Sequence, residues 1–308
     1  MDCAISVSEL TKKLGDVPAL NGVDLEVRKG GIHGLLGSNG SGKTTIIRTL
    51  TGLVRADSGT AQVFGHDVWH ESVDARRLLT YVPAEVTLWP RLTGGEAIAA
   101  LGRLRGGTDG DRQRKLIERF GLDPTRRGRT YSPGDRRKIA LIAAFAADTE
   151  LLLFDEPTTG LDPLTEAVFA ECIAEHAARG RTTLITSDSP ADIQRSCTSV
   201  TLIRDGRTVT AGLVSELKQF SRTTITATTH IGPTPIGNAP GVHNLRRTDA
   251  PNTVVFDVDA DQIDPVMTTL TGLGIVSISA AAPTLADVFL RGSADDEVTA
   301  PAIPGATR

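Results

Sequence analysis

The fold is decided by the stretch Gly37-Ser38-Asn39-Gly40-Ser41-Gly42-Lys43-Thr44, which carries every defining residue of a phosphate-binding loop. The apolar run Gly31–Leu36 before it is typical of a buried strand, and Thr45–Leu50 after it has the pattern of a helix. Glycines let such a loop fold tightly, so that its N–H groups surround a polyphosphate. We therefore predict a nucleotide site here, in preference to a glycine-rich turn that binds nothing.

Two carboxylates follow a second buried strand. The run Leu151–Phe154 is apolar throughout and ends in Asp155 and Glu156. Ligands bind at this end of the strands in open α/β sheets. With the loop, the pattern predicts that Lys43 reaches the β- and γ-phosphates and that Thr44 and Asp155 hold Mg²⁺. Glu156 is then the residue that polarises the attacking water or acts as general base. A strand followed by a capped turn is the alternative.

Composition limits the remaining possibilities. The chain has 308 residues, of which 40% are hydrophobic and 23% charged, as in a globular protein with a large core and a second small domain. A net charge of −4 gives no argument for a nucleic-acid partner. No run approaches the roughly 18 apolar residues of a membrane-spanning helix. Neither a secretory signal nor a disulfide framework is evident, which favours reduced thiols in the cytoplasm.

Hydrophobic patterning predicts a mainly parallel α/β core with an antiparallel portion near the start. The strands expected outside the two sites above are Ala4–Glu9, Val23–Val27, Thr60–Phe64, Leu78–Pro83 and Thr182–Thr186, and a hairpin of Val200–Ile203 with Thr208–Thr210. Leu164–Ala178 has the pattern of a helix. From Thr93 to Ala147 the pattern is helical, with breaks at Gly106-Gly107 and Asp123-Pro124.

A domain boundary is expected near Leu217–Arg222, where the α/β rhythm ends. We predict a first domain over residues 1–218, with a helical subdomain at about 93–147, and a small α+β domain over 219–292. The expected elements of the small domain are a strand at Thr253–Val258, a helix at Asp261–Leu270, a strand at Ile275–Ala280 and a short helix at Thr284–Leu290. Residues 293–308 are expected to form a disordered tail.

A third motif begins a helix upstream of the second carboxylate strand. In Tyr131-Ser132-Pro133-Gly134-Asp135-Arg136-Arg137-Lys138, Ser132 and the backbone of Gly134 can present donors at a helix N-terminus, where anions bind. A plain serine cap with an arginine-rich first turn explains the same residues. From these residues alone, both interpretations stay open.

Taken together, the phosphate loop, the Ser132-x-Gly134 segment, Asp155-Glu156 and Thr159-Gly160-Leu161-Asp162 resemble the ATP-binding subunits of ATP-binding-cassette transporters, in the same order. The resemblance covers roughly residues 4–218. It implies a P-loop NTPase fold with a RecA-like core, an antiparallel β subdomain and an α-helical subdomain. Three further segments are similar to the bacterial drug- and antibiotic-exporter subgroup, daunorubicin-resistance-like proteins among them: Tyr81-Val82-Pro83, Leu92-Thr93-Gly94 and Ala282–Leu290.

The resemblance implies an ATPase that needs ATP, Mg²⁺ and partner chains. Two such domains would sandwich two nucleotides head to tail, each site pairing Gly37–Thr45 of one chain with Ser132, Gly134 and Asp135 of the other. Asp162 would also line the site, and a homodimer is expected. Separate membrane-spanning subunits would receive the motion, in part through the loop around Ala84 and Trp89, at the cytoplasmic face of the membrane. The alternatives are a soluble cassette ATPase of translation or DNA repair, and a regulatory subunit with little turnover.

Several positions depart from the family's pattern. Leu14 stands where an aromatic ring covers adenine, and Ala84, followed by Glu85, stands where a glutamine contacts Mg²⁺ and the membrane partner. In the helix-starting motif, Pro133 replaces a frequent glycine and Asp135 a neutral residue. The sharpest departure is Asp188, at the position of a histidine that contacts the γ-phosphate. An ionised aspartate cannot donate to phosphate and repels it, so hydrolysis is expected to be slow or regulated.

The Leu14 substitution predicts weakened nucleotide binding. Stacking of a base on an aromatic side chain is worth about 1–3 kcal/mol in nucleic-acid complexes, whereas leucine keeps only apolar contact. Leu14→Tyr should therefore lower the dissociation constant for ATP, measured by equilibrium binding. An unchanged dissociation constant would remove the idea that this position covers the base.

Overall fold

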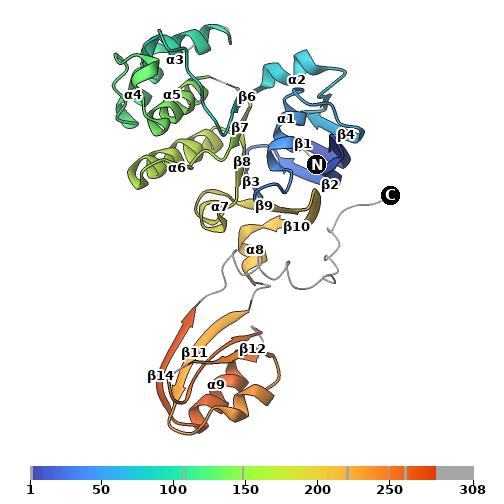
Figure 1. The fold of residues 1–308 in the computed structure, drawn as a ribbon, viewed down its shortest axis with the longest axis vertical. Helices are drawn as coiled ribbons and strands as arrows, with labels where there is room; N and C mark the ends of the chain where they lie inside the picture. Colours follow the sequence, from blue (N-terminus) through green and yellow to red (C-terminus); the bar gives the residue numbers. More distant parts are fainter. Residues whose placement is uncertain are drawn as a thin grey trace. The chain divides into compact units, whose positions relative to one another are not determined.

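The computed structural model describes residues 3–105, 107, 109–147, 149–219, 222–248, 250–259 and 262–281. It divides into two compact units, of which the first ends at Gly212 and the second begins at Leu213 (Figure 1). The expected helix at Thr284–Leu290 and the tail at 293–308 lie outside the described residues. The domain bounds 1–218 and 219–292 stay a prediction.

A six-stranded sheet forms the centre of the first unit, in the order β10-β9-β3-β8-β7-β6. Its strands are β3 (Ile32–Leu36), β6 (Leu79–Val82), β7 (Leu151–Asp155), β8 (Thr182–Ser187), β9 (Ser199–Arg204) and β10 (Arg207–Leu213). In this order, each strand from β9 through β3, β8 and β7 to β6 is parallel to the next one. Every residue of β3 and β7 is buried, which explains their continuous apolar runs. The predicted fold class, a P-loop α/β core, is confirmed.

The antiparallel portion is a second sheet, in the order β2-β1-β4-β5. It consists of β1 (Cys3–Leu14), β2 (Val17–Arg28), β4 (Ser58–Val63) and β5 (His66–Asp67). The first two strands are longer than Ala4–Glu9 and Val23–Val27, the ranges that we expected. Glu9 has a positive φ of 46° and the register shifts between Val7 and Leu10. This irregularity breaks the alternation of side chains, so the sequence pattern stops before the strand does.

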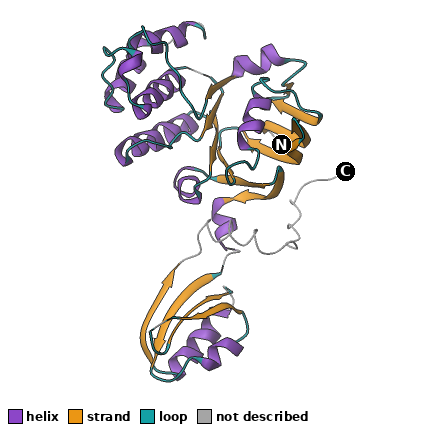
Figure 2. Ribbon diagram, viewed as in Figure 1, coloured by secondary structure: helices purple, strands orange, loops and turns teal. Residues whose placement is uncertain are grey.

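Helices cover the central sheet and form a separate group next to it (Figure 2). They are α1 (Lys43–Leu50), α2 (Ser72–Leu78), α3 (Gly94–Arg103), α4 (Gly110–Arg119), α5 (Pro133–Ala146), α6 (Pro163–Ala178) and α7 (Pro190–Ser196), with a 3₁₀ turn η1 at Gly128–Thr130. Three of these, α3 to α5, fall within the predicted helical subdomain. Phe145 of α5 packs against Phe154 of β7, with 5.4 Å between ring centroids, and against Phe169 of α6, at 5.9 Å. Buried aromatic contacts thus fix α5 to the strand that ends in Asp155.

The second unit is a four-stranded antiparallel sheet in the order β12-β13-β11-β14. Its elements are α8 (Val214–Gln219), β11 (Thr223–Thr229), η2 (Thr234–Asn238), β12 (Val242–Arg247), β13 (Thr253–Val258), α9 (Ile263–Gly272) and β14 (Ile275–Ala281). Ile225, Phe256 and Leu270 lie in its own hydrophobic core. The expected strand, helix and strand are present, and β11 and β12 are additional. β11 is mostly threonine, so its apolar alternation is weak.

Within the described ranges, no helix has the length and apolar character that crossing a membrane requires.

His33 lies buried on β3 and gives the fold a testable dependence on pH. Its ring nitrogens are 2.8 Å from Ser199 Oγ and 2.9 Å from Thr201 Oγ1, and burial lowers its pKa to about 4. Between about pH 6.5 and 4 the unfolded chain therefore binds a proton that the folded chain excludes, so stability falls as pH falls. The loss from this group is on the order of 3 kcal/mol at most.

Denaturant unfolding of the wild-type chain and of His33→Gln, measured from pH 7 to pH 4, checks this. The stability advantage of the wild type should shrink as the pH falls through that window. A variant at the exposed His70, His70→Gln, serves as the control and should follow the wild type. An advantage that stays constant with pH would contradict the assignment.

Candidate functional site

The phosphate loop is shaped by glycines at its two ends. Gly42 precedes α1 with a φ of 105°, and a Cβ there would lie 2.7 Å from the carbonyl oxygen of Ala19. At Gly37 a Cβ would lie 2.6 Å from the carbonyl oxygen of Ile203. Neither position tolerates a side chain without moving the backbone around it. The tight turn leaves the free N–H groups of the first turn of α1 at the end of the loop, where an anion binds.

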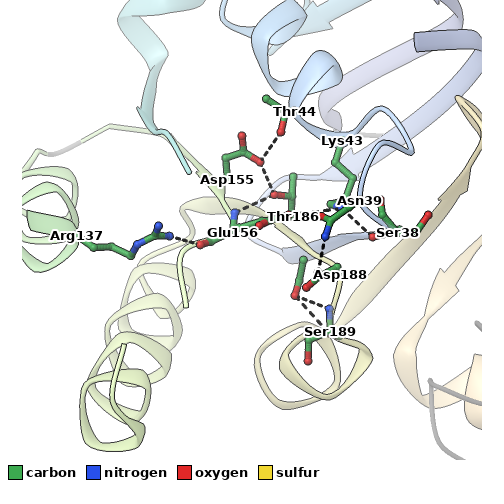
Figure 3. A network of polar contacts seen from close by, with 12 residues as sticks. Ser38, Asn39, Lys43, Thr44, Arg137, Asp155, Glu156, Thr186, Asp188 and Ser189 are labelled. Carbon is green, nitrogen blue, oxygen red and sulfur yellow. Dashed lines mark hydrogen bonds and ion pairs between the residues drawn. The ribbon is translucent and has the colours of Figure 1, made fainter. Parts of the chain in front are cut away.

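Lys43 is folded back onto the loop (Figure 3). Its side chain is 4% exposed, and its amino group donates to the carbonyl oxygens of Gly37, at 2.7 Å, and Ser38, at 3.1 Å. The same nitrogen lies 3.6 Å from Glu156 Oε1. The structure thus pairs the lysine of the phosphate loop with the carboxylate that we predicted to be the general base.

Asp155 and Thr44, the two predicted Mg²⁺ ligands, lie together. Oδ1 of Asp155 accepts hydrogen bonds from the hydroxyls of Thr186, at 2.7 Å, and Thr44, at 3.3 Å. Oδ2 is buried and has no hydrogen-bond partner among the described residues. A buried carboxylate oxygen without a partner is costly, and hard oxygen atoms are the ligands that Mg²⁺ prefers. The residues present therefore fit a magnesium ion.

Glu156 has a constrained backbone. Its φ is 48°, in the left-handed region that non-glycine residues rarely adopt. Its N–H donates to Thr186 Oγ1 at 3.0 Å, and its carbonyl oxygen accepts from the guanidinium of Arg137 on α5. Thr186 and Arg137 were not predicted as site residues from the sequence. The available signals were a threonine near the end of a buried strand and an arginine near the start of a helix.

Asp188 follows β8 directly and is exposed beside the phosphate loop. Its Oδ2 lies 3.4 Å from Nδ2 of Asn39, and the N–H of Gly37 donates to the carbonyl oxygen of Ser187 at 3.2 Å. Figure 3 shows the Asp188 side chain next to Asn39 of the loop. Its effect on a bound phosphate remains a prediction.

Leu14 ends β1 and faces solvent. It pairs with Val17 across the β1–β2 turn, and the two residues are 50% and 67% exposed. Val17 comes two residues before Ala19, whose carbonyl oxygen would lie 2.7 Å from a Cβ at Gly42. The contact of this exposed apolar pair with a nucleotide base stays a prediction.

Ser132, Gly134, Asp135 and Asp162 form a second group. The Ser132 hydroxyl accepts from the N–H of Asp135 at 3.1 Å and donates to Asp135 Oδ2 at 2.9 Å. A Cβ on Gly134 would lie 3.0 Å from the carbonyl oxygen of Gly160. Asp162 caps α6, where hydrogen bonds from the hydroxyl and N–H of Thr165 lower its pKa to about 2.

The two groups are separate within one chain. Among the residues that the structure describes, no hydrogen bond or ion pair joins Ser132, Gly134, Asp135 or Asp162 to the phosphate loop. That the two groups form two halves of a composite site, completed by a second copy, stays a prediction.

Comparison with known proteins gives a consistent result. A family model described as "ABC transporter" matches residues 20–159. The chain is 37% identical over 222 residues to the daunorubicin resistance ATP-binding protein DrrA3 of Streptomyces coeruleorubidus, covering 70% of each chain. It is 31% identical to the linearmycin resistance ATP-binding protein LnrL of Bacillus subtilis, covering 69% of this chain and 70% of that one. A solved ATP-binding subunit of an ABC transporter superposes with a TM-score of 0.65 at 26% identity, covering 70% of this chain and 92% of that one.

The carboxylate at position 188 yields a prediction about turnover. Replacing it by histidine removes a negative charge and adds a donor beside the expected γ-phosphate, so Asp188→His should raise the rate of ATP hydrolysis about tenfold or more. The rate is measured in the assembled complex by phosphate release. Asp188→Asn, which removes only the charge and offers an amide, should give a smaller rise. A fall or no change in the histidine variant would count against the assignment.

Proposed function

The chain belongs to the ABC transporter family of ATP-binding subunits, and from this premise we propose that it powers the export of drugs or antibiotics through separate membrane-spanning subunits. It binds ATP with Mg²⁺ and hydrolyses ATP to ADP and phosphate, the general activity of the family. Subunits of this family dimerise and act with membrane permeases. The named relatives confer resistance to daunorubicin and linearmycin, which is the support for an antibiotic-like substrate.

One observation carries the assignment of the site. The buried, unpartnered Oδ2 of Asp155 stands beside the Thr44 hydroxyl at the start of α1. A metal ion there would lie where the nucleotide's phosphates meet the loop, and would neutralise charge that develops on them during transfer. Thr44 and Asp155 would hold it, with Thr186 fixing the Asp155 carboxylate through the other oxygen.

Binding of ATP releases the general base. Lys43 Nζ now donates to two loop carbonyls and lies 3.6 Å from Glu156 Oε1. Phosphate oxygens carry more negative charge than those carbonyls and draw the ammonium group toward the nucleotide. Glu156 then loses its cationic partner, and its carboxylate becomes free to accept a proton.

Hydrolysis follows as a displacement at the γ-phosphorus. A water oxygen bonds to phosphorus while the bond to the β–γ bridging oxygen breaks, and the Glu156 carboxylate takes the proton of the attacking water. The bridging oxygen leaves with its electron pair on ADP. Asp188 adds negative charge next to the loop and donates nothing in its ionised form, so this chain is proposed to turn over slowly.

A second copy completes each site. We assign Ser132 and Gly134 of that copy to the γ-phosphate, because Ser132 caps α5 and the N–H groups at a helix N-terminus favour an anion. Closure on two ATP molecules and reopening after hydrolysis would move the permease. The proposed location is the cytoplasmic face of the membrane, through these partners. Asp188 favours one second candidate, a subunit that binds ATP for regulation with little turnover.

Glu156→Gln tests the catalytic assignment. The amide keeps the shape of the side chain and cannot accept the proton, so kcat should fall about 100-fold or more while ATP binding persists. Phosphate release and equilibrium nucleotide binding measure the two quantities. Glu175→Gln, on the surface of α6, is the matched control and should leave kcat unchanged. Full ATPase activity in Glu156→Gln would refute the role of this residue.

Export is tested by finding the partner. The chain, tagged and purified from membranes of its source cell, should retain a polytopic membrane protein, and that complex should hydrolyse ATP. Recovery of the chain without any membrane protein, together with full ATPase activity alone, would favour a non-transport ATPase.

A further inference from the structure

Arg137 joins two backbone segments that are far apart in the sequence. One terminal nitrogen of its guanidinium donates to the carbonyl oxygen of Glu156, and the other donates to that of Ala84. Both carbonyls lie just past neighbouring parallel strands, β7 and β6, which pair with Val82 opposite Phe154. The arginine comes from α5, the helix that Ser132 caps. Three elements of the first unit therefore meet at one half-buried side chain.

Arg137 binds the carbonyl group of Glu156, and the N–H group of Glu156 is bound as well. The N–H of Glu156 is bound by Thr186 Oγ1 at 3.0 Å, and its carbonyl by Arg137 (Figure 3). The backbone between them has a φ of 48°, a conformation that costs on the order of 1–3 kcal/mol unless its surroundings enforce it. Loss of either contact would let the residue relax and shift its carboxylate.

On the other side, Arg137 holds the loop between β6 and α3, residues 83–93. Position 84 is alanine, which offers only its backbone to a partner. The carbonyl of Ala84 is bound by Arg137, so a rigid connection exists without a polar side chain at this position. The loop also carries Trp89, which is 48% exposed.

We propose that Arg137 is the positioning residue that transmits movement of the 83–93 loop to the backbone of Glu156. The inference rests on the proposed function. A planar guanidinium spans two acceptors in a fixed geometry, which a lysine ammonium on a flexible stem does not reproduce. Displacement of the loop by the permease would shift the guanidinium and, with it, the general base.

Arg137→Lys in the full chain is the test, with Arg136→Lys as the matched control. Arg136 lies in the same helical turn, and its Nε donates to the carbonyl oxygen of Tyr131, at 3.2 Å. We expect Arg137→Lys to lower kcat about 10–100-fold, because small misplacements of a catalytic group cost that much, with an unchanged dissociation constant for ATP. Stimulation of ATPase by the co-purified membrane protein should also be lost, whereas Arg136→Lys should retain both. A purely structural role would weaken ATP binding together with kcat.

Hydrogen exchange tests the same contacts without depending on ATPase activity. The amide of Glu156 and the amides of residues 84–89 should exchange faster in Arg137→Lys than in Arg136→Lys, while α9 in the second unit should show equal protection in both. Wild-type kcat, wild-type stimulation or unchanged exchange at Glu156 in Arg137→Lys would overturn the proposal. If Glu156→Gln keeps its ATPase activity, the proposed function fails instead, so the two failures are distinguishable.

Discussion

The site depends on the hydroxyl of Thr186. The register of β7 and β8 places Asp155 opposite Thr186, so one oxygen accepts from the N–H of Glu156, at 3.0 Å, and donates to Oδ1 of Asp155, at 2.7 Å. This single group orients the proposed magnesium ligand and fixes the backbone of the proposed general base. It also leaves Oδ2 of Asp155 buried and unpartnered, a cost that the fold bears unless a cation is present.

Much of this arrangement was predictable from the sequence, because the chemistry demands particular residues in order. Glycine is required at positions 37 and 42 because a Cβ there would clash with the carbonyl oxygens of Ile203 and Ala19. The strands β3 and β7 are fully buried, so each appears in the sequence as a continuous apolar run. They also place the phosphate loop and Asp155 at the same end of the strands of one sheet. Local pattern and global fold agree at these positions.

The rest was hidden because it depends on contacts between distant segments. Nothing local distinguishes Arg137 from the arginine before it, yet only Arg137 reaches the carbonyls of Glu156 and Ala84. β1 continues past an irregularity at Glu9, so its exposed end at Leu14 does not follow from alternation. In the second unit, the threonines of β11 alternate with too few apolar residues to predict a strand. Such features require the tertiary structure.

We propose that one chain carries two halves of different ATP sites. The most direct measurement is the molar mass of the Glu156→Gln chain in solution, by light scattering, with and without Mg²⁺ and ATP. Blocked hydrolysis should hold the closed state, so the account predicts the mass of two chains with ATP and of one chain without it. A single-chain mass at saturating ATP would contradict the account, because the phosphate loop would then bind its nucleotide without Ser132 of a second copy.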